Sequence, residues 1–179
     1  LSERLVFKDC NVTVYCHKGL FEIRPKEIKG IKLVYIPTIE TKILSQPIHS
    51  FLSIIHACFS NTDVLLVVNS ANGPFGLLTK LFKVPTAINV DGLEWLRPKW
   101  KGLGSIYFKW ASKMATLFYD QIINDSDEMR KVYLNLFKRD SKVIAYGADI
   151  RKSKNPELIT TWDIKQREYY LVIGRLIPD

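Results

Sequence analysis

The sequence predicts an α/β protein built around a doubly wound, parallel β-sheet. Short apolar runs alternate with segments of helical periodicity along most of the chain, as strands and helices do in such folds. The apolar runs are nearly continuous and rich in β-branched residues, which is typical of strands that helices cover on both faces. With 179 residues, 47% of them apolar and 25% charged, the chain is long enough for one domain with a sizeable core.

Six strands are expected, each a short apolar run bounded by polar or turn-forming residues. The run at residues 63–69 is rich in valine and leucine, which indicates a strand buried on both faces. The run at residues 86–90 ends abruptly in an Asp-Gly pair. The complete set comprises residues 12–16, 31–36, 63–69, 86–90, 121–124 and 142–145.

Three amphipathic helices are predicted between these strands from apolar residues spaced by three and four. The first begins near Ser45 and Pro47. Asp125 with Glu128 resembles a capping box at the start of the third, and residues 1–7 resemble the end of a further helix. The three stripes comprise Ile48, Phe51, Leu52, Ile55, Cys58 and Phe59; Ile106, Trp110, Met114, Leu117 and Phe118; and Met129, Val132, Tyr133, Leu136 and Phe137.

The polar segment at residues 151–168, which contains an Asn-Pro pair, predicts a linker with one short helix. The apolar run at residues 169–179 predicts the start of another strand. One isolated strand cannot bury itself, so it either adds to another sheet or opens a second domain. We expect residues 1–150 to form one domain, and we interpret the chain as a fragment cut at both ends.

Positive charge is concentrated in one part of the chain. The net charge is +8 and the pI about 9.4, which favours anionic partners such as nucleic acid, phosphate groups or an anionic membrane face. Residues 95–119 contain five cations and no acid, interleaved with aromatic residues. This segment predicts a membrane-facing patch, or alternatively a solvated helix face with Trp110 in the core. The cations are Arg97, Lys99, Lys101, Lys109 and Lys113.

Histidine and cysteine show no metal-binding spacing. His49 and His56 share a helix face without a third ligand, and His17 is expected in a loop. Three cysteines without a CxxC spacing predict buried thiols in a reducing cytoplasm. The sequence has no P-loop, no GxGxxG and no nucleophile elbow.

Polar residues follow several strands, where doubly wound sheets bind their ligands. Asp91 and Glu94 follow residues 86–90, and a carboxylate there can orient a hydroxyl and accept its proton. Alternatively, Asp91 caps a turn and Glu94 pairs with Arg97. Asn69, Asn72 and Gly73 follow another strand, either as sugar-binding amides or as a turn that satisfies its own backbone.

Two blocks of sequence resemble the N-terminal domain of GT-B glycosyltransferases. Val-Ile-Ala-Tyr-Gly-Ala-Asp at residues 143–149, followed by Val-Ile-Gly-Arg-Leu at residues 172–176, is similar to the interdomain junction of that family. Asn-x-Ala-Asn-Gly-Pro at residues 69–74, with Asn-Val-Asp-Gly-Leu-Glu-Trp at residues 89–95, is similar to a bacterial subgroup labelled rhamnosyltransferase. The resemblance covers essentially the whole chain.

The resemblance implies two Rossmann-like domains facing each other across a cleft. This chain would be the acceptor-binding domain without its first strand, and residues 169–179 would open the donor-binding domain. The implied catalytic residues are Asp91 and Glu94. The implied acceptor-binding residues are Asn69, Asn72, Gly73, Gly92, Trp95 and Arg97, and the residues expected at the hinge and donor are Gly147, Asp149, Gly174 and Arg175.

The expected activity is transfer of a hexose, rhamnose by the subgroup label, from a nucleotide sugar to a lipid-linked or polysaccharide acceptor. No cofactor or metal and no nucleic-acid partner is expected. The fragment alone is expected to be inactive, and its location cytoplasmic or peripheral on the inner face of the cell membrane. Two alternatives stay open: a nucleic-acid-binding module, although no RNP, KH or zinc-finger pattern is present, and a fragment of a dinucleotide-dependent enzyme.

Overall fold

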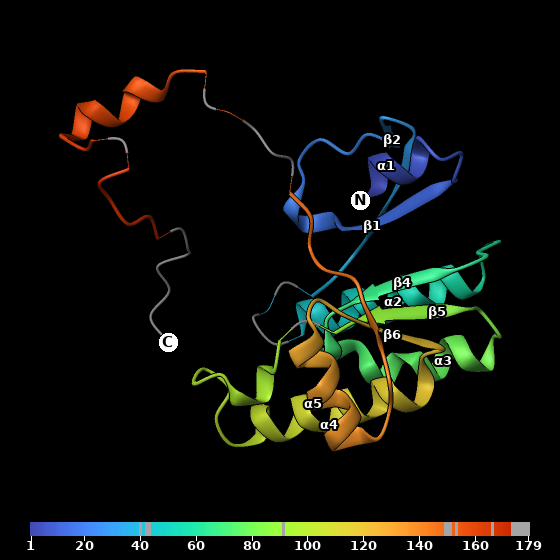
Figure 1. The fold of residues 1–179 in the computed structure, drawn as a ribbon. Coiled ribbons are helices and arrows are strands. Elements are labelled where there is room, and N and C mark those ends of the chain that lie inside the picture. Colours follow the sequence, from blue (N-terminus) through green and yellow to red (C-terminus); the bar gives the residue numbers. More distant parts are fainter. Residues whose placement is uncertain are drawn as a thin grey trace.

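The computed structural model describes residues 1–39, 41, 44–90, 92–148, 152, 154–165 and 167–172. Its main body is a four-stranded parallel sheet of β4 (Leu65–Val68), β5 (Thr86–Asn89), β6 (Gln121–Asn124) and β7 (Lys142–Val143), in that spatial order. Helices flank the sheet, which confirms the predicted α/β class (Figure 1). They are α2 (Ser45–Cys58), α3 (Gly76–Leu81), α4 (Leu103–Phe118) and α5 (Asp127–Phe137).

The strands nearer the start of the chain form a second, smaller sheet. After helix α1 (Ser2–Val6), β1 (Val12–His17) pairs in parallel with β3 (Ile31–Ile36), and β2 (Glu27–Ile28) adds to β3 in the antiparallel direction. Within the described residues, β1 pairs only with β3 and β4 pairs only with β5. In the part of the chain that the structure describes, β1 is therefore the parallel edge strand of the small sheet, and β4 and β7 are the two edge strands of the main sheet.

Side chains of β1 connect the small sheet to helix α2. The Tyr15 hydroxyl lies 3.1 Å from His56 Nδ1. The rings of His17 and His49 are stacked, with centroids 3.9 Å apart. The His17 contact places the end of β1 near the start of α2, and the Tyr15 contact lies at the last turn of the same helix, which leads into β4.

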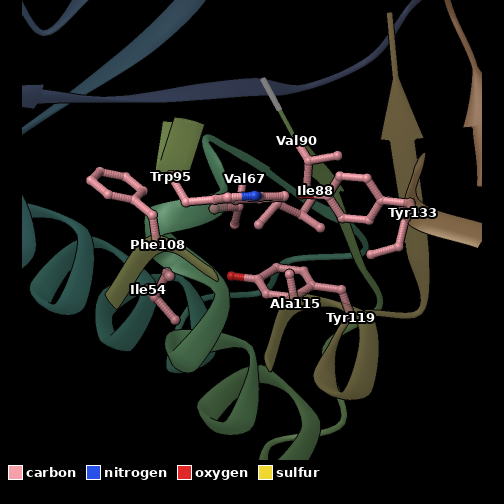
Figure 2. Packing of buried hydrophobic residues seen from close by; sticks show 10 residues of the cluster. Ile54, Val67, Ile88, Val90, Trp95, Phe108, Ala115, Tyr119 and Tyr133 are labelled. Carbon is pink, nitrogen blue, oxygen red and sulfur yellow. The ribbon is translucent and has the colours of Figure 1, made fainter. Parts of the chain in front are cut away.

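The core of the main body lies between the four-stranded sheet and its helices. Ile88 and Ile122, from the two central strands, are fully buried. Figure 2 shows the rings of Trp95, Tyr119 and Tyr133 gathered around the β4 and β5 side chains. Large aromatic side chains therefore close this core on the helix side, which accounts for much of its buried apolar area.

Helix α4 packs against the turn that follows β4, and this turn requires small side chains. The turn is a 3₁₀ helix, η2 (Ser70–Phe75). A Cβ added to Gly73 would lie 1.9 Å from the Ala111 carbonyl oxygen. The two backbones are therefore in direct contact, and α4 turns its small and polar residues inward. The buried residues are Phe108, Ala111, Ser112, Ala115 and Thr116.

This packing shows that the alternative interpretation with Trp110 in the core is wrong. Ile106, Trp110 and Leu117 of the predicted stripe are exposed, because the side of α4 that carries Ala111 and Ala115 lies against Gly73 and so faces the core. Helix α2 also buries mainly small and polar residues, although less consistently than α4. Its buried residues are His49, Ser50, Ser53, Ile54 and Ala57, and Phe51 and Phe59 of the predicted stripe are exposed.

Local details differ from the sequence predictions at several boundaries. The Ser126 hydroxyl caps α5 by accepting from the Met129 N–H at 3.4 Å, so the cap is not the predicted pair of Asp125 and Glu128. The expected linker contains the 3₁₀ helix η4 (Pro156–Trp162). Residues 169–172 form no strand and residues 173–179 lie outside the described residues, so the division into domains stays a prediction.

Replacing Gly73 with alanine is expected to lower the free energy of unfolding by about 1–3 kcal/mol or more, because the new methyl group meets backbone atoms that cannot rotate away. Urea unfolding followed by circular dichroism measures the change. Gly147→Ala is the matched control, since a Cβ there has no atom within 4 Å. Equal stability of the two variants would contradict the close contact.

Candidate functional site

Three asparagines lie at the carboxyl ends of neighbouring strands in the four-stranded sheet. Asn69 follows β4, Asn89 is the last residue of β5, and Asn124 is the last residue of β6. The register pairs Val68 with Asn89 and Asn89 with Ile123, so the three positions share one edge of the sheet. Ligands of open parallel sheets bind at this edge.

Asn89 and Asn124 are not among the site residues expected from the sequence, because both lie within apolar runs that predict strands. In the structure, the side-chain oxygens of both residues are buried and have no hydrogen-bond partner among the described residues. The Asn124 amide nitrogen donates to Ser141 Oγ at 2.6 Å. A buried acceptor without a donor costs about 1–3 kcal/mol, so both oxygens call for a ligand or water that donates a hydrogen bond.

Asn69 has a backbone conformation that is unusual for a residue with a side chain, with φ of 77° and ψ of 129°. Its backbone N–H donates to the Asn89 carbonyl at 2.9 Å. Its side-chain oxygen accepts from the Ala71 N–H at 2.9 Å. Asn69 thus extends the ladder by one bond and then starts η2, in agreement with its alternative interpretation as a turn residue.

Asn72 and Gly73 serve the packing of η2. The Asn72 side chain donates to the Val68 carbonyl at 2.8 Å, and its own carbonyl accepts from the Tyr119 hydroxyl at 2.9 Å. Burial raises the pKa of Tyr119, which keeps this hydroxyl a donor over the whole accessible pH range. These contacts explain both residues without a ligand, and their role in acceptor binding stays a prediction.

The loop after β5 is organised around the carboxylate of Glu94, in the short 3₁₀ helix η3 (Glu94–Leu96). The Glu94 side chain is only 6% exposed. Its Oε1 accepts from Arg97 Nε at 2.9 Å, and its Oε2 accepts from Trp100 Nε1 at 2.9 Å. Lys99 Nζ lies 3.9 Å from the same Oε2. This geometry suits a structural clamp, as in the alternative pairing with Arg97, and the catalytic role of Glu94 stays a prediction.

The other candidates of this loop divide between core and surface. Trp95 is buried in the core, with its ring edge-on to Phe137 at 6.2 Å between centroids, and its carbonyl accepts from Ser105 Oγ. Arg97 is about half exposed at 47%. At Gly92 an added Cβ would make only an ordinary contact, 3.7 Å from Arg97 Nη2, so packing does not require glycine there.

Several candidates lie outside the described residues: Asp91, Asp149, Gly174 and Arg175. Gly147 is described and exposed, and a Cβ placed on it would have no atom within 4 Å. Their predicted roles in catalysis, at the hinge and at the donor therefore stay predictions.

The sequence predicts a loop at His17 and groups His49 with His56, whereas in the structure His17 is the last residue of β1 and its ring stacks on that of His49. Only the packing of β1 on α2 brings these two rings together. Burial, and secondarily the neighbouring His17 ring, lowers the pKa of His49, whereas a hydrogen bond with the Cys16 backbone raises it. His17 Nε2 lies 3.3 Å from Gln46 Oε1. Among the described residues, no group of three or more potential ligands is arranged to hold a metal ion.

Residues 48–149 match the model of a protein family described as a domain of unknown function (DUF1972). The chain belongs to this family. The DUF1972 match begins in α2 and spans the four-stranded sheet with all three strand-end asparagines. The comparison with curated proteins finds no match. In the part of the chain that the structure describes, no helix has the length and apolar character needed to cross a membrane.

Acidification is expected to destabilise the protein through His49. Because its pKa is lower in the folded chain than the usual 6.5, the unfolded chain binds the proton first. The free energy of unfolding should therefore fall as the pH drops below about 6.5. His49→Gln should reduce this loss.

Urea midpoints measured from pH 7.5 to pH 5 test this expectation, with His56→Gln as the control, since that variant retains the stacked pair. Identical slopes for wild type and His49→Gln would contradict the assignment.

Proposed function

We propose that this chain is the acceptor-binding part of a GT-B glycosyltransferase. The enzyme would transfer a hexose, with rhamnose as the candidate, from a nucleotide sugar to a lipid-linked or polysaccharide acceptor during synthesis of a cell-surface glycan. The observation that carries the proposal is the row of asparagines at the carboxyl edge, with the unpartnered, buried side-chain oxygens of Asn89 and Asn124.

Amide oxygens at this position suit a ligand rich in hydroxyl groups. A sugar hydroxyl donates one hydrogen bond and accepts others, so it satisfies a buried carbonyl oxygen that the protein leaves without a donor. The β5 ladder continues to Val90, whose N–H donates to the Ile123 carbonyl at 3.0 Å. Asp91 is the next residue in the sequence, directly after this edge.

In the proposed reaction, an acceptor hydroxyl attacks the anomeric carbon of the donor sugar. The bond between that carbon and the nucleotide phosphate breaks, and the nucleotide leaves with the bonding electrons. Asp91 would orient the hydroxyl and accept its proton. The Gly147, Asp149, Gly174 and Arg175 motif supports the assignment through its resemblance to the GT-B junction, and the donor would be bound chiefly by the second domain.

The intact transferase provides the decisive test. A screen of nucleotide sugars should find one whose hydrolysis or transfer it catalyses. Asp91→Ala should abolish transfer while sugar-nucleotide affinity stays nearly unchanged, because the residue belongs to the acceptor half. Asp63→Ala is the matched control, since Asp63 is exposed and precedes β4 at the opposite edge of the sheet. Loss of donor affinity with turnover preserved would refute the role of Asp91.

The isolated chain offers a second test that needs no donor. Titration with an oligosaccharide acceptor is expected to shift the side-chain amide resonances of Asn89 and Asn124 in ¹⁵N-edited spectra. Asn89→Ala should weaken the binding. If the shifts are confined to residues away from the carboxyl edge, the asparagines are not the acceptor site.

A further inference from the structure

The outer surface of α4 and α5 is apolar where a helix face in contact with water is usually polar. Ile106 is 66% exposed, Trp110 48%, Leu117 52% and Leu136 52%. Three of these residues follow one another on α4 at helical spacing, and Leu136 faces them from α5. We call these four side chains and the lysines between them, Lys109, Lys113 and Lys138, the α4–α5 surface.

The α4–α5 surface forms a shallow groove rather than a scatter of single residues. Its volume is about 510 Å³, and both helices contribute to its walls. Figure 1 shows α4 and α5 at the margin of the main body, on the side away from β1. No described part of the chain covers the groove, so the apolar side chains are in contact with water in the isolated chain.

The orientation of α4 explains why this apolar stripe is exposed. The contact of its backbone with Gly73 requires small residues inward, so Ser112 and Thr116 are buried while Trp110 and Leu117 point away from the core. The exposed side chains of Ile106, Trp110 and Leu117 therefore do not contribute to the core of this domain. Contiguous apolar patches of this kind mark sites of interaction.

The charge of the groove identifies the partner. Lys109, Lys113 and Lys138 are among its lining residues, and no acidic residue lines it. Lys101 adds a further exposed cation just before α4. Helices that lie in a membrane interface typically combine apolar side chains and a tryptophan with lysines at the border and no acidic residues. Lysine stems can lie along apolar surface while their ammonium groups reach anionic head groups.

We propose that the α4–α5 surface docks on an anionic lipid bilayer, with Ile106, Trp110 and Leu117 inserted between head groups and the lysines in contact with lipid phosphates. The surface differs from the one expected on the sequence: Trp95 is buried, and Glu94 accepts a hydrogen bond from Trp100. The patch instead extends from Ile106 to Leu117 and onto α5. The inference does not depend on a transferase activity.

Co-sedimentation of the 179-residue chain with lipid vesicles tests the proposal. Binding is expected to vesicles that contain phosphatidylglycerol and not to vesicles of phosphatidylcholine alone, and it should weaken as salt is added. Lys109→Gln with Lys113→Gln should lower the partition coefficient about tenfold or more. Ile106→Ser with Trp110→Ser should lower it similarly while the salt dependence remains.

The matched control is Lys8→Gln with Lys26→Gln, which removes the same charge from exposed positions near the small sheet. Circular dichroism establishes that each variant is folded. Equal losses in both lysine pairs would mean non-specific attraction by net charge and would overturn the proposal. Absence of vesicle binding would overturn it as well. If the chain then self-associates in sedimentation velocity and Trp110→Ser abolishes this, the groove binds protein instead.

Discussion

The contact between the Gly73 backbone and α4 determines how the main sheet is covered. Because no side chain fits at this position, α4 lies directly on η2 and turns alanine, serine and threonine towards the core. Two tyrosine hydroxyls of α4 and its C-cap, those of Tyr107 and Tyr119, donate to the carbonyls of Ala71 and Asn72 and hold η2 in place. The close contact is thus reinforced by two hydrogen bonds to consecutive carbonyls of the turn.

The candidate site depends on the same contact. Since Asn69 caps the start of η2, the fixed position of the turn also fixes the unusual backbone of Asn69 beside Asn89. The adjoining loop is held separately, by the Glu94 carboxylate and its partners Arg97 and Trp100. The carboxyl edge is therefore bordered by two turns that hydrogen bonds hold in place, and the buried oxygens of Asn89 and Asn124 lie at strand ends where the backbone is held by the ladder. Side chains that the surrounding structure holds in position in this way are better suited to bind a ligand than side chains on a flexible loop.

The sequence predicted those features of the fold that are determined by residues close together in the chain. The central strands β5 and β6 were recognised because their apolar runs are bounded by polar residues, and the alternative pairing of Glu94 with Arg97 follows from their spacing of three. The orientation of α4 was not predictable, because periodicity shows that a stripe exists but not that a distant glycine excludes it from the core. The stacking of His17 on His49 likewise depends on two elements meeting in space.

The free edges of β1 and β4 have a consequence for how this chain meets other polypeptides. In β4, Leu65 and Asn69 donate their amide hydrogens to the β5 side, so the amides of Leu66 and Val68 point to the open side. Val64, Leu66 and Val68 also expose their side chains, so the prediction that this strand is buried on both faces is wrong. An unprotected edge of this kind is a template for strand addition. Segments with high β-propensity that run along β4 can extend the main sheet, which makes this edge an aggregation hazard of the chain.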